Sequence, residues 1–192
     1  MKKLLASLFC IPLLLIAACG TDNTPPQTEV EVDRSVYPDG PYGVSAGSII
    51  DNLDFMTSEG TPFDLNMLHA DESRKLLLIT TSAGWCAACI EEQPFLRELY
   101  TNNVDAGLEV VVSVFEDSQF QPADVELAAD WKENYSLPFT VLADSEQKFS
   151  AYYNTEATPM TMFVDLDTME ILNVLSGADR SVVESLVESL LE

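Results

Sequence analysis

The sequence predicts an α/β fold with a central mixed β-sheet, helices on both of its faces and an N-terminal β-hairpin extension. Two continuous apolar runs, at residues 76–81 and 108–115, are typical of buried parallel strands. A segment with apolar residues at helical spacing follows each run, at residues 86–100 and 123–135. Strand–helix–strand–helix order of this kind, followed by a hairpin and a helix, indicates a mixed sheet with helical layers.

The elements are expected in a simple order along the chain. Glu59-Gly60 provides a turn signal inside the first hairpin, and Asp165-Leu166-Asp167 provides one inside the last. In order, we expect a hairpin at 55–65, a strand at 76–81, a helix at 86–100, a strand at 108–115, a helix at 123–135, a short strand at 139–142, a helical turn or two at 149–153, a hairpin of 160–164 with 171–175, and a helix at 181–191.

Residues 1–18 have the features of a secretory signal peptide. A short positive segment, Met1-Lys2-Lys3, precedes an apolar run from Leu4 to Ile16 that is too short to span a bilayer as a mature helix. Ile16-Ala17-Ala18-Cys19 resembles the lipobox of bacterial lipoproteins, in which the signal is cleaved before a cysteine that carries lipid. The resemblance implies lipidation at Cys19; an ordinary signal peptide with a chance cysteine is the alternative.

Residues 19–43 are expected to form a lipidated cysteine and a disordered tether, and residues 44–192 the folded domain. The tether segment is polar, acidic and proline-bearing, without a sustained apolar period. A flexible coil of this length reaches roughly 25–30 Å on average. Gly20 follows the lipidated cysteine, which by the enteric sorting rule slightly favours the outer membrane over the inner one.

The charge of the chain excludes some classes of function. All 32 acidic residues lie beyond Cys19, whereas Lys2 and Lys3 leave with the signal, so seven basic residues remain and the net charge is near −25. Such a surface repels nucleic acid and anionic lipid headgroups. It is compatible with an acidic surface without a specific partner, or with basic partners such as positively charged cytochromes.

The count of cysteines limits the chemistry to one pair. Cys10 leaves with the signal and Cys19 carries lipid, so only Cys86 and Cys89 remain as thiols. Their spacing brings them within reach of each other or of one metal ion. A zinc site would need His69 and a carboxylate as further ligands, and we instead expect His69 to be a surface or loop residue.

The local order of elements favours a reactive thiol at Cys86. The buried strand ends near Thr81, a turn follows at residues 82–84, and a helix begins near Cys86. Unpaired N–H groups and the helix dipole favour a thiolate there, so Cys86 is expected to be an exposed nucleophile with a depressed pKa. Cys89 lies one turn further along, sheltered and placed to resolve a mixed disulfide.

These residues resemble the active site of the thioredoxin superfamily, and in particular its TlpA/ResA-like branch, which is related to the AhpC/TSA redoxins. Trp85-Cys86-x-x-Cys89 matches the superfamily motif, Cys89-Ile90-Glu91-Glu92-Gln93-Pro94 matches the CxxExP continuation of the branch, and Thr158-Pro159 matches its threonine and cis-proline. The resemblance covers residues 44–192. Two further segments resemble the strands around the proline loop: Leu137–Asp144 and Thr161–Asp165.

The resemblance implies a thioredoxin-like fold and a role for each motif. Cys86 and Cys89 would form the redox-active disulfide, so no other cofactor and no metal is expected. Trp85, Thr158 and Pro159 would contact the substrate. Glu92 shares a helix face with Cys89 and would transfer the proton of that thiol; the alternative is a solvated carboxylate like Glu91.

Three departures from the family pattern qualify these expectations. Thioredoxins proper carry a buried aspartate where this chain has Thr80, which increases the importance of Glu92. Ser82 stands where a tryptophan is common, and Ala88 where a proline is usual. Because the dipeptide between the cysteines influences the redox potential, Ala87-Ala88 leaves the direction of electron flow open.

We therefore expect a lipid-anchored thiol–disulfide oxidoreductase of the cell envelope that faces the periplasm, acts on protein disulfides and works as a reductase. Expected partners are protein disulfides, including apocytochrome c or other basic envelope proteins, and an upstream membrane thiol reductant.

Two other classes of function match the sequence less well. A redoxin-type peroxidase fits poorly with Trp85 directly before Cys86. A copper carrier of this fold would space its cysteines three apart and place a histidine downstream, whereas His69 lies upstream.

Overall fold

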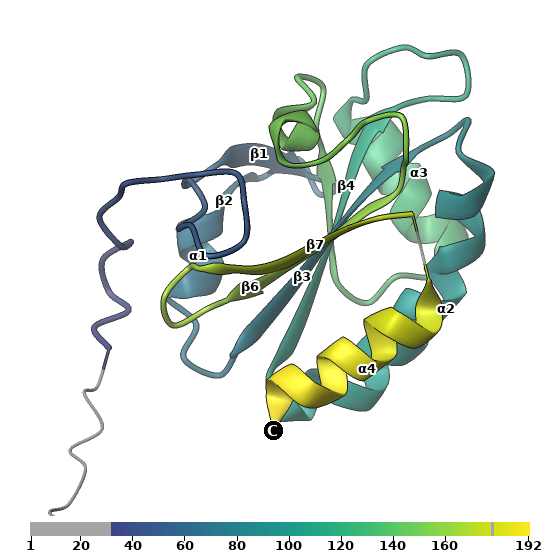
Figure 1. Ribbon diagram of the computed structural model, residues 1–192. Helices are drawn as coiled ribbons and strands as arrows, with labels where there is room; N and C mark the ends of the chain where they lie inside the picture. The colour runs from purple at the N-terminus through teal and green to yellow at the C-terminus, as the bar shows by residue number, and fades with distance from the viewer. Residues whose placement is uncertain (1–31, 178) are drawn as a thin grey trace, which may run out of the picture. The chain divides into compact units, whose positions relative to one another are not determined.

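The computed structural model describes residues 32–177 and 179–192, which form a seven-stranded mixed sheet (Figure 1). The expected signal peptide, the lipidation site at Cys19 and most of the expected tether lie outside the described residues. The strands lie in the order β2-β1-β5-β4-β3-β6-β7. Their bounds are β1 Asp54–Thr57, β2 Pro62–Asp64, β3 Leu76–Ala83, β4 Leu108–Glu116, β5 Thr140–Ala143, β6 Met160–Asp165 and β7 Ile171–Ser176.

The three central strands are parallel, and two of them, β3 and β4, carry the expected apolar runs. β3 pairs with β4 and β4 pairs with β5, while β1 and β6 add antiparallel strands on either side. All eight residues of β3 are buried, because the sheet is covered on both faces at its centre. The helical elements are α1 Leu65–His69, α2 Ala87–Asn103, η1 Val104–Ala106, α3 Val125–Tyr135, η2 Lys148–Tyr152 and α4 Arg180–Leu191, where η marks a 3-10 helix.

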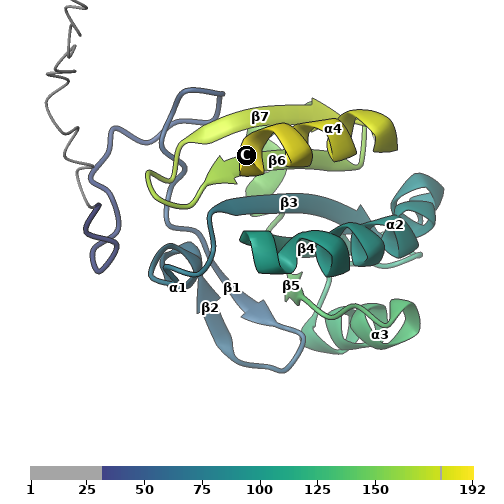
Figure 2. The same cartoon turned by 90° about the horizontal axis from the view of Figure 1, so that it is seen from below.

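The two faces of the sheet are covered by different kinds of structure, as the view in Figure 2 makes clear. The three long helices α2, α3 and α4 pack on one face, where Leu96, Trp131 and Val187 meet the side chains of β3 and β4. The short elements α1 and η2 pack on the other, where Leu65 and Phe149 contribute to a second core. The expected α/β class with helices on both faces is confirmed.

Local signals explain where the elements start and turn. Gly60 has a φ of 73°, so the β1–β2 turn uses a residue that tolerates the left-handed region. Asp124 begins α3 by accepting a hydrogen bond from the Leu127 N–H at 2.9 Å, and Asp179 does the same for the Ser181 N–H at 3.1 Å at the start of α4. The expected hairpins, strands and long helices are confirmed, whereas the helix α1 was not predicted.

Packing against the domain begins earlier than residue 44, where we expected it. Arg34 is only 6% exposed, and its guanidinium donates to the Leu68 carbonyl oxygen at 3.2 Å and to the Asp71 carbonyl oxygen at 2.9 Å. It also forms an ion pair of 3.0 Å with Asp167 in the β6–β7 turn. A planar group with five donors can satisfy several carbonyl oxygens at once, which fixes this segment to the domain.

His69 is fully buried, so the expectation of a surface or loop residue is wrong. It ends α1, and its ring nitrogens lie 2.7 Å from the Leu166 carbonyl oxygen and 3.2 Å from the Val36 carbonyl oxygen. The imidazole therefore links the β6–β7 turn to the segment that carries Arg34. Within residues 32–177 and 179–192, no helix is both long and apolar enough to cross a membrane.

Candidate active site

The two cysteines lie at the junction of the central strand β3 and the helix α2. β3 ends at Ala83, and Cys86 is the N-cap residue of α2. A disulfide joins Cys86 and Cys89, with their Cα atoms 5.3 Å apart, and the Cys89 N–H donates to Cys86 Sγ at 3.2 Å. A free N–H group of the first helical turn thus points at the sulfur of Cys86, in a position that would stabilise a thiolate.

The sulfur of Cys86 is more enclosed than we expected from the sequence, whereas Cys89 is buried as expected. Cys86 is 5% exposed and Cys89 is fully buried, because they pack with Ala83 and Phe115. The expectation of an exposed Cys86 is therefore corrected to a nearly buried residue with a small accessible area. The order of the two cysteines is as expected, since Cys86 is the more accessible.

The proline loop lies directly beside the disulfide. The Thr158–Pro159 peptide bond is cis, and Cys86 Sγ lies 3.9 Å from the Thr158 carbonyl oxygen. The loop is tied to the central strand because the Met160 N–H donates to the Thr81 hydroxyl at 3.0 Å. Residues that are 72 positions apart in the sequence thus form one surface, as the motifs predicted.

Glu92 is buried within α2, one turn beyond Cys89. It is 3% exposed, and the Thr80 hydroxyl donates to its Oε1 at 2.8 Å. Burial raises the pKa of Glu92 to about 7, although the Thr80 hydrogen bond and the charge of Arg180 oppose this shift. Glu92 also borders a surface cavity of about 580 Å³ with Ala88 and Arg180, so this carboxyl lies between the interior and the solvent.

The residue before the first cysteine is part of an aromatic group. Trp85 is 38% exposed, and its ring stacks on Phe120 with centroids 5.5 Å apart. Its indole N–H donates to Glu116 Oε2 at 2.8 Å, and the rings of Trp85 and Phe115 lie nearly perpendicular, with centroids 6.0 Å apart. Sequence reasoning identified Trp85 but missed Phe120 and Glu116, because neither belongs to a motif.

The backbone close to the motif leaves no space for a side chain at Gly84. A Cβ atom there would lie 2.6 Å from the Ser118 amide nitrogen and 2.8 Å from the Asp117 carbonyl carbon. The Gly84 N–H donates to the Glu116 carbonyl oxygen at 2.8 Å. The loop that carries Phe120 is therefore packed directly against the turn before Cys86.

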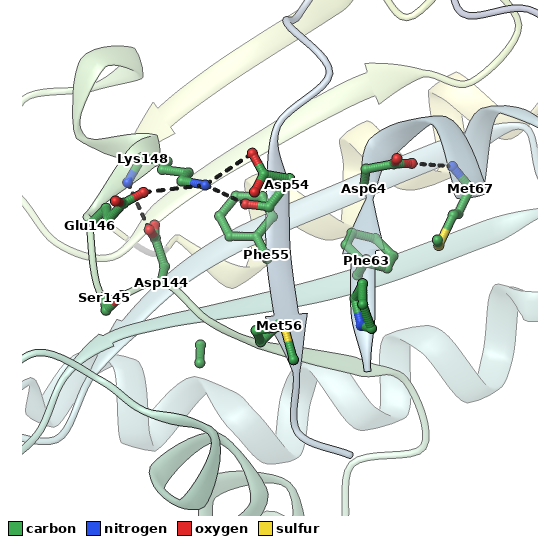
Figure 3. A pocket seen from close by; sticks show the side chains of 12 residues that line it. Asp54, Phe55, Met56, Phe63, Asp64, Met67, Asp144, Ser145, Glu146 and Lys148 are labelled. Carbon is green, nitrogen blue, oxygen red and sulfur yellow. Dashed lines mark hydrogen bonds and ion pairs between the residues drawn. The ribbon is translucent and has the colours of Figure 1, made fainter. Parts of the chain in front are cut away.

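A second cavity, of about 300 Å³, lies at the edge of the sheet formed by β1 and β2 (Figure 3). Lys148 extends across it, with Nζ 3.2 Å from Asp54 Oδ1 and 3.3 Å from Glu146 Oε2. None of the predicted site residues lines this cavity, so we place the active site at the disulfide.

A disulfide at the start of a helix, beside a cis-proline loop on a mixed sheet, defines a protein of the thioredoxin superfamily, TlpA/ResA-like in its CxxExP motif. The chain belongs to the AhpC/TSA family, whose sequence profile matches residues 46–171.

Comparisons with individual proteins agree with this class. Thiol-disulfide oxidoreductase ResA of Bacillus anthracis is 21% identical over 106 residues, which cover 55% of this chain and 58% of that protein. Thioredoxin-like protein YneN of Bacillus subtilis (strain 168) is 28% identical over 123 residues, 64% of this chain and 67% of that protein. The chain thus spans little more than half the length of the ResA relatives that it matches.

A solved structure shows the same fold. It is that of a protein from Chlorobium tepidum assigned as the thiol:disulfide interchange protein DsbE, and it superposes with a TM-score of 0.65 at 16% identity. The match covers 78% of this chain and all of that one. The thioredoxin-like fold expected from the motifs is therefore confirmed.

Proposed function

We propose that this protein is a thiol–disulfide oxidoreductase that reduces protein disulfides through Cys86 and Cys89. One observation carries the proposal: the sulfur of the N-cap residue Cys86 lies both within reach of a helix N–H, at 3.2 Å, and beside the carbonyl of the cis-proline loop, at 3.9 Å. The first contact favours a thiolate nucleophile. The second places backbone hydrogen-bonding groups where a bound substrate segment would run.

The proposed reaction moves two electrons from the protein to its substrate. The Cys86 thiolate attacks one sulfur of a substrate disulfide, forms a mixed disulfide and releases the first substrate thiolate. The Cys89 thiolate then attacks Cys86 Sγ and releases the second. The products are a substrate dithiol and the Cys86–Cys89 disulfide, which an upstream thiol reductant must reduce again. Trp85, Thr158 and Pro159 are the proposed substrate contacts.

Glu92 is the proposed proton acceptor for the second step. Cys89 is fully buried, so its thiol needs a nearby base rather than bulk water to lose its proton. Glu92 lies three residues further along α2 and its pKa is about 7, so its carboxylate is a base of suitable strength near neutral pH. No cofactor beyond the disulfide is required by this scheme.

We further propose that the protein acts in the bacterial cell envelope, held at a membrane by lipid on Cys19 and facing the periplasm, with the outer membrane slightly favoured. The signal-like residues 1–18 and the lipobox support this location. The net charge near −25 makes basic proteins, such as apocytochrome c, suitable substrates. A membrane thiol reductant would be the electron donor.

The test is the reduction of insulin by the purified chain with dithiothreitol as the reductant. We expect catalysis by the wild type, none by Cys86→Ser, and trapping of a mixed disulfide by Cys89→Ser. Equal behaviour of the wild type and Cys86→Ser would contradict the proposal. If Cys89→Ser still consumed hydrogen peroxide, a peroxidase would be favoured. If the protein purified under native conditions with one equivalent of copper, a metal carrier would be favoured.

The direction of electron flow needs a separate measurement. Equilibration of the Cys86–Cys89 couple with glutathione buffers of known ratio gives its reduction potential. A reductase requires a potential well below that of the compartment in which it works. A potential above that of the compartment would identify an oxidase instead.

A further inference from the structure

Trp85, one of the proposed substrate contacts, forms an exposed aromatic pair with Phe120, which has no role in the reaction described above. Phe120 is 63% exposed and Trp85 38%, although both belong to residue types that are usually buried. Their rings are stacked at an interplanar angle of 23°. One face of Phe120 therefore lies on Trp85, and the other is open to solvent.

The structure holds this pair in place through several contacts. Phe120 has a φ of 61°, a left-handed conformation that a bulky residue rarely adopts without support. The support is Asp117, whose Oδ1 accepts the N–H groups of Gln119 at 2.7 Å and Gln121 at 2.8 Å. On the other side, Glu116 fixes the indole through the hydrogen bond to its N–H group. Trp85 and Phe120 thus form a fixed aromatic surface, the aromatic platform, and its Trp85 directly precedes Cys86 in the chain.

The charges around the platform are negative. Glu116 and Asp117 precede Phe120 in the chain, and Glu116 accepts the hydrogen bond of the Trp85 indole. No lysine or arginine occurs in residues 82–91 and 115–124, which carry the two rings and the cysteines; Arg180 contacts the helix further along, where it donates to the Glu91 carbonyl oxygen. An aromatic face next to carboxylates binds cations, because the ring quadrupole and the carboxylate charges attract the same ligand.

We propose that Trp85 and Phe120 bind an arginine or lysine side chain of the substrate protein, close to the substrate cysteine that Cys86 attacks. This inference rests on the proposed reductase function and adds a substrate preference to it. Phe120 would be a specificity-determining residue. The carboxylate of Glu116 strengthens the platform, because a hydrogen bond from the indole to an anion makes the ring a better partner for a cation.

The experiment uses three disulfide peptides that differ only in the residue next to the cysteine, which is arginine, leucine or glutamate. The rate at which the reduced full-length chain reduces each peptide is divided by the rate with dithiothreitol, because a neighbouring charge changes the intrinsic reactivity of a disulfide. We expect the arginine peptide to react about two- to fivefold faster than the leucine peptide after this correction.

Phe120→Leu separates the platform from the overall charge. The variant keeps the net charge and an apolar side chain but lacks the aromatic face, so the ratio of the corrected rates for the arginine and leucine peptides should fall towards one. Met67→Leu is the control, because Met67 is also exposed, at 52%, but lies on α1. It should keep the full preference.

Two outcomes would overturn the inference and a third would overturn the function itself. Equal corrected rates for the three peptides in the wild type would remove the preference. If Phe120→Leu still preferred the arginine peptide, the preference would come from the overall negative charge of the protein rather than from the aromatic platform. If no peptide reacts faster with the wild type than with Cys86→Ser, the proposed reductase function fails, and the inference fails with it.

Discussion

The buried carboxyl of Glu92 should make the stability of the protein depend on pH in a specific way. Its pKa is about 7 in the folded protein, because burial disfavours the charged form, compared with an ordinary value of 4.5. Between these two values the folded state holds a proton that the unfolded state has lost. The free energy of unfolding must therefore fall as the pH rises through this range.

The size of the effect follows from the shift. Each pKa unit corresponds to about 1.36 kcal/mol, so a shift from 4.5 to about 7 costs the folded protein about 3 kcal/mol above neutral pH. The group is 3% exposed, so screening by solvent reduces this figure little. Glu92→Gln removes the titration and keeps an oxygen that can accept the hydrogen bond of Thr80.

The assay is urea unfolding of the oxidised protein at pH 4 and pH 8, for the wild type and Glu92→Gln. We expect the wild type to lose about 3 kcal/mol more than the variant between the two pH values. Glu91→Gln is the matched control, because it changes the net charge equally at an exposed neighbouring position. The other carboxyl groups, including the buried Glu109 and Asp144, contribute equally to the wild type and to the variant. Their contributions therefore cancel when the two changes in the free energy of unfolding are subtracted.

Two results would refute this reasoning. If the wild type and Glu92→Gln lost the same stability between pH 4 and pH 8, the carboxyl would not be held protonated by its surroundings. If Glu91→Gln changed the pH dependence as much as Glu92→Gln did, the effect would come from net charge. In either case Glu92 would lose the physical basis of its proposed role as a base near neutral pH.

Two further substitutions test the packing around the site and the N-terminal segment. Gly84→Ala should destabilise the protein by about 1–3 kcal/mol in urea unfolding and alter the near-ultraviolet signal of Trp85, because its Cβ would collide with the Ser118 backbone at 2.6 Å; an unchanged unfolding curve would show that the 117–121 loop yields easily. Arg34→Lys should cost about 2–4 kcal/mol, because one ammonium group cannot replace the planar fork that bonds several carbonyl oxygens and Asp167. The same measurement checks it, and a loss below about 0.5 kcal/mol would mean that the segment at Arg34 does not add to the stability of the domain.

The sequence was sufficient for the elements that bury continuous or periodic apolar surface. β3 and β4 could be predicted because a strand covered on both faces must be apolar along its whole length. α1 could not, because its five residues make barely more than one turn and its only local signal is the cap at Asp64. Periodicity needs more residues than this helix contains.

The contacts of the N-terminal segment could not be predicted for a different reason. Arg34 and His69 are polar; arginine side chains are mostly exposed in proteins, and histidine side chains are buried less often than apolar ones. Their burial depends on carbonyl oxygens of Leu68, Asp71 and Leu166, which come from two parts of the chain. Backbone carbonyls carry no mark in the sequence, so a partner of this kind is visible only in three dimensions.

The active site was also predicted only in part, because contacts made by loop residues leave no pattern in the sequence. The motifs located Cys86, Cys89 and the proline loop, because each of these residue types is needed at its position for the chemistry. Phe120 was missed because it lies in a loop without periodicity, at a position defined by the hydrogen bonds of Asp117. Its exposure, rather than its sequence context, is what distinguishes it from a core phenylalanine.

Thr80 shows how a departure from a family pattern can be understood once the contacts are known. An aspartate at this position would lie at hydrogen-bond distance from the buried Glu92, and two carboxylates so close cannot both be ionised. The hydroxyl of Thr80 instead donates to Glu92, which lowers the pKa while burial raises it. The balance of these two opposing effects gives a pKa of about 7, so that both protonation states of Glu92 are populated near neutral pH. A proton acceptor that must later release its proton needs both protonation states to be accessible near neutral pH. Two carboxyl groups in hydrogen-bond contact would instead titrate as a coupled pair, with one pKa pushed well above the other.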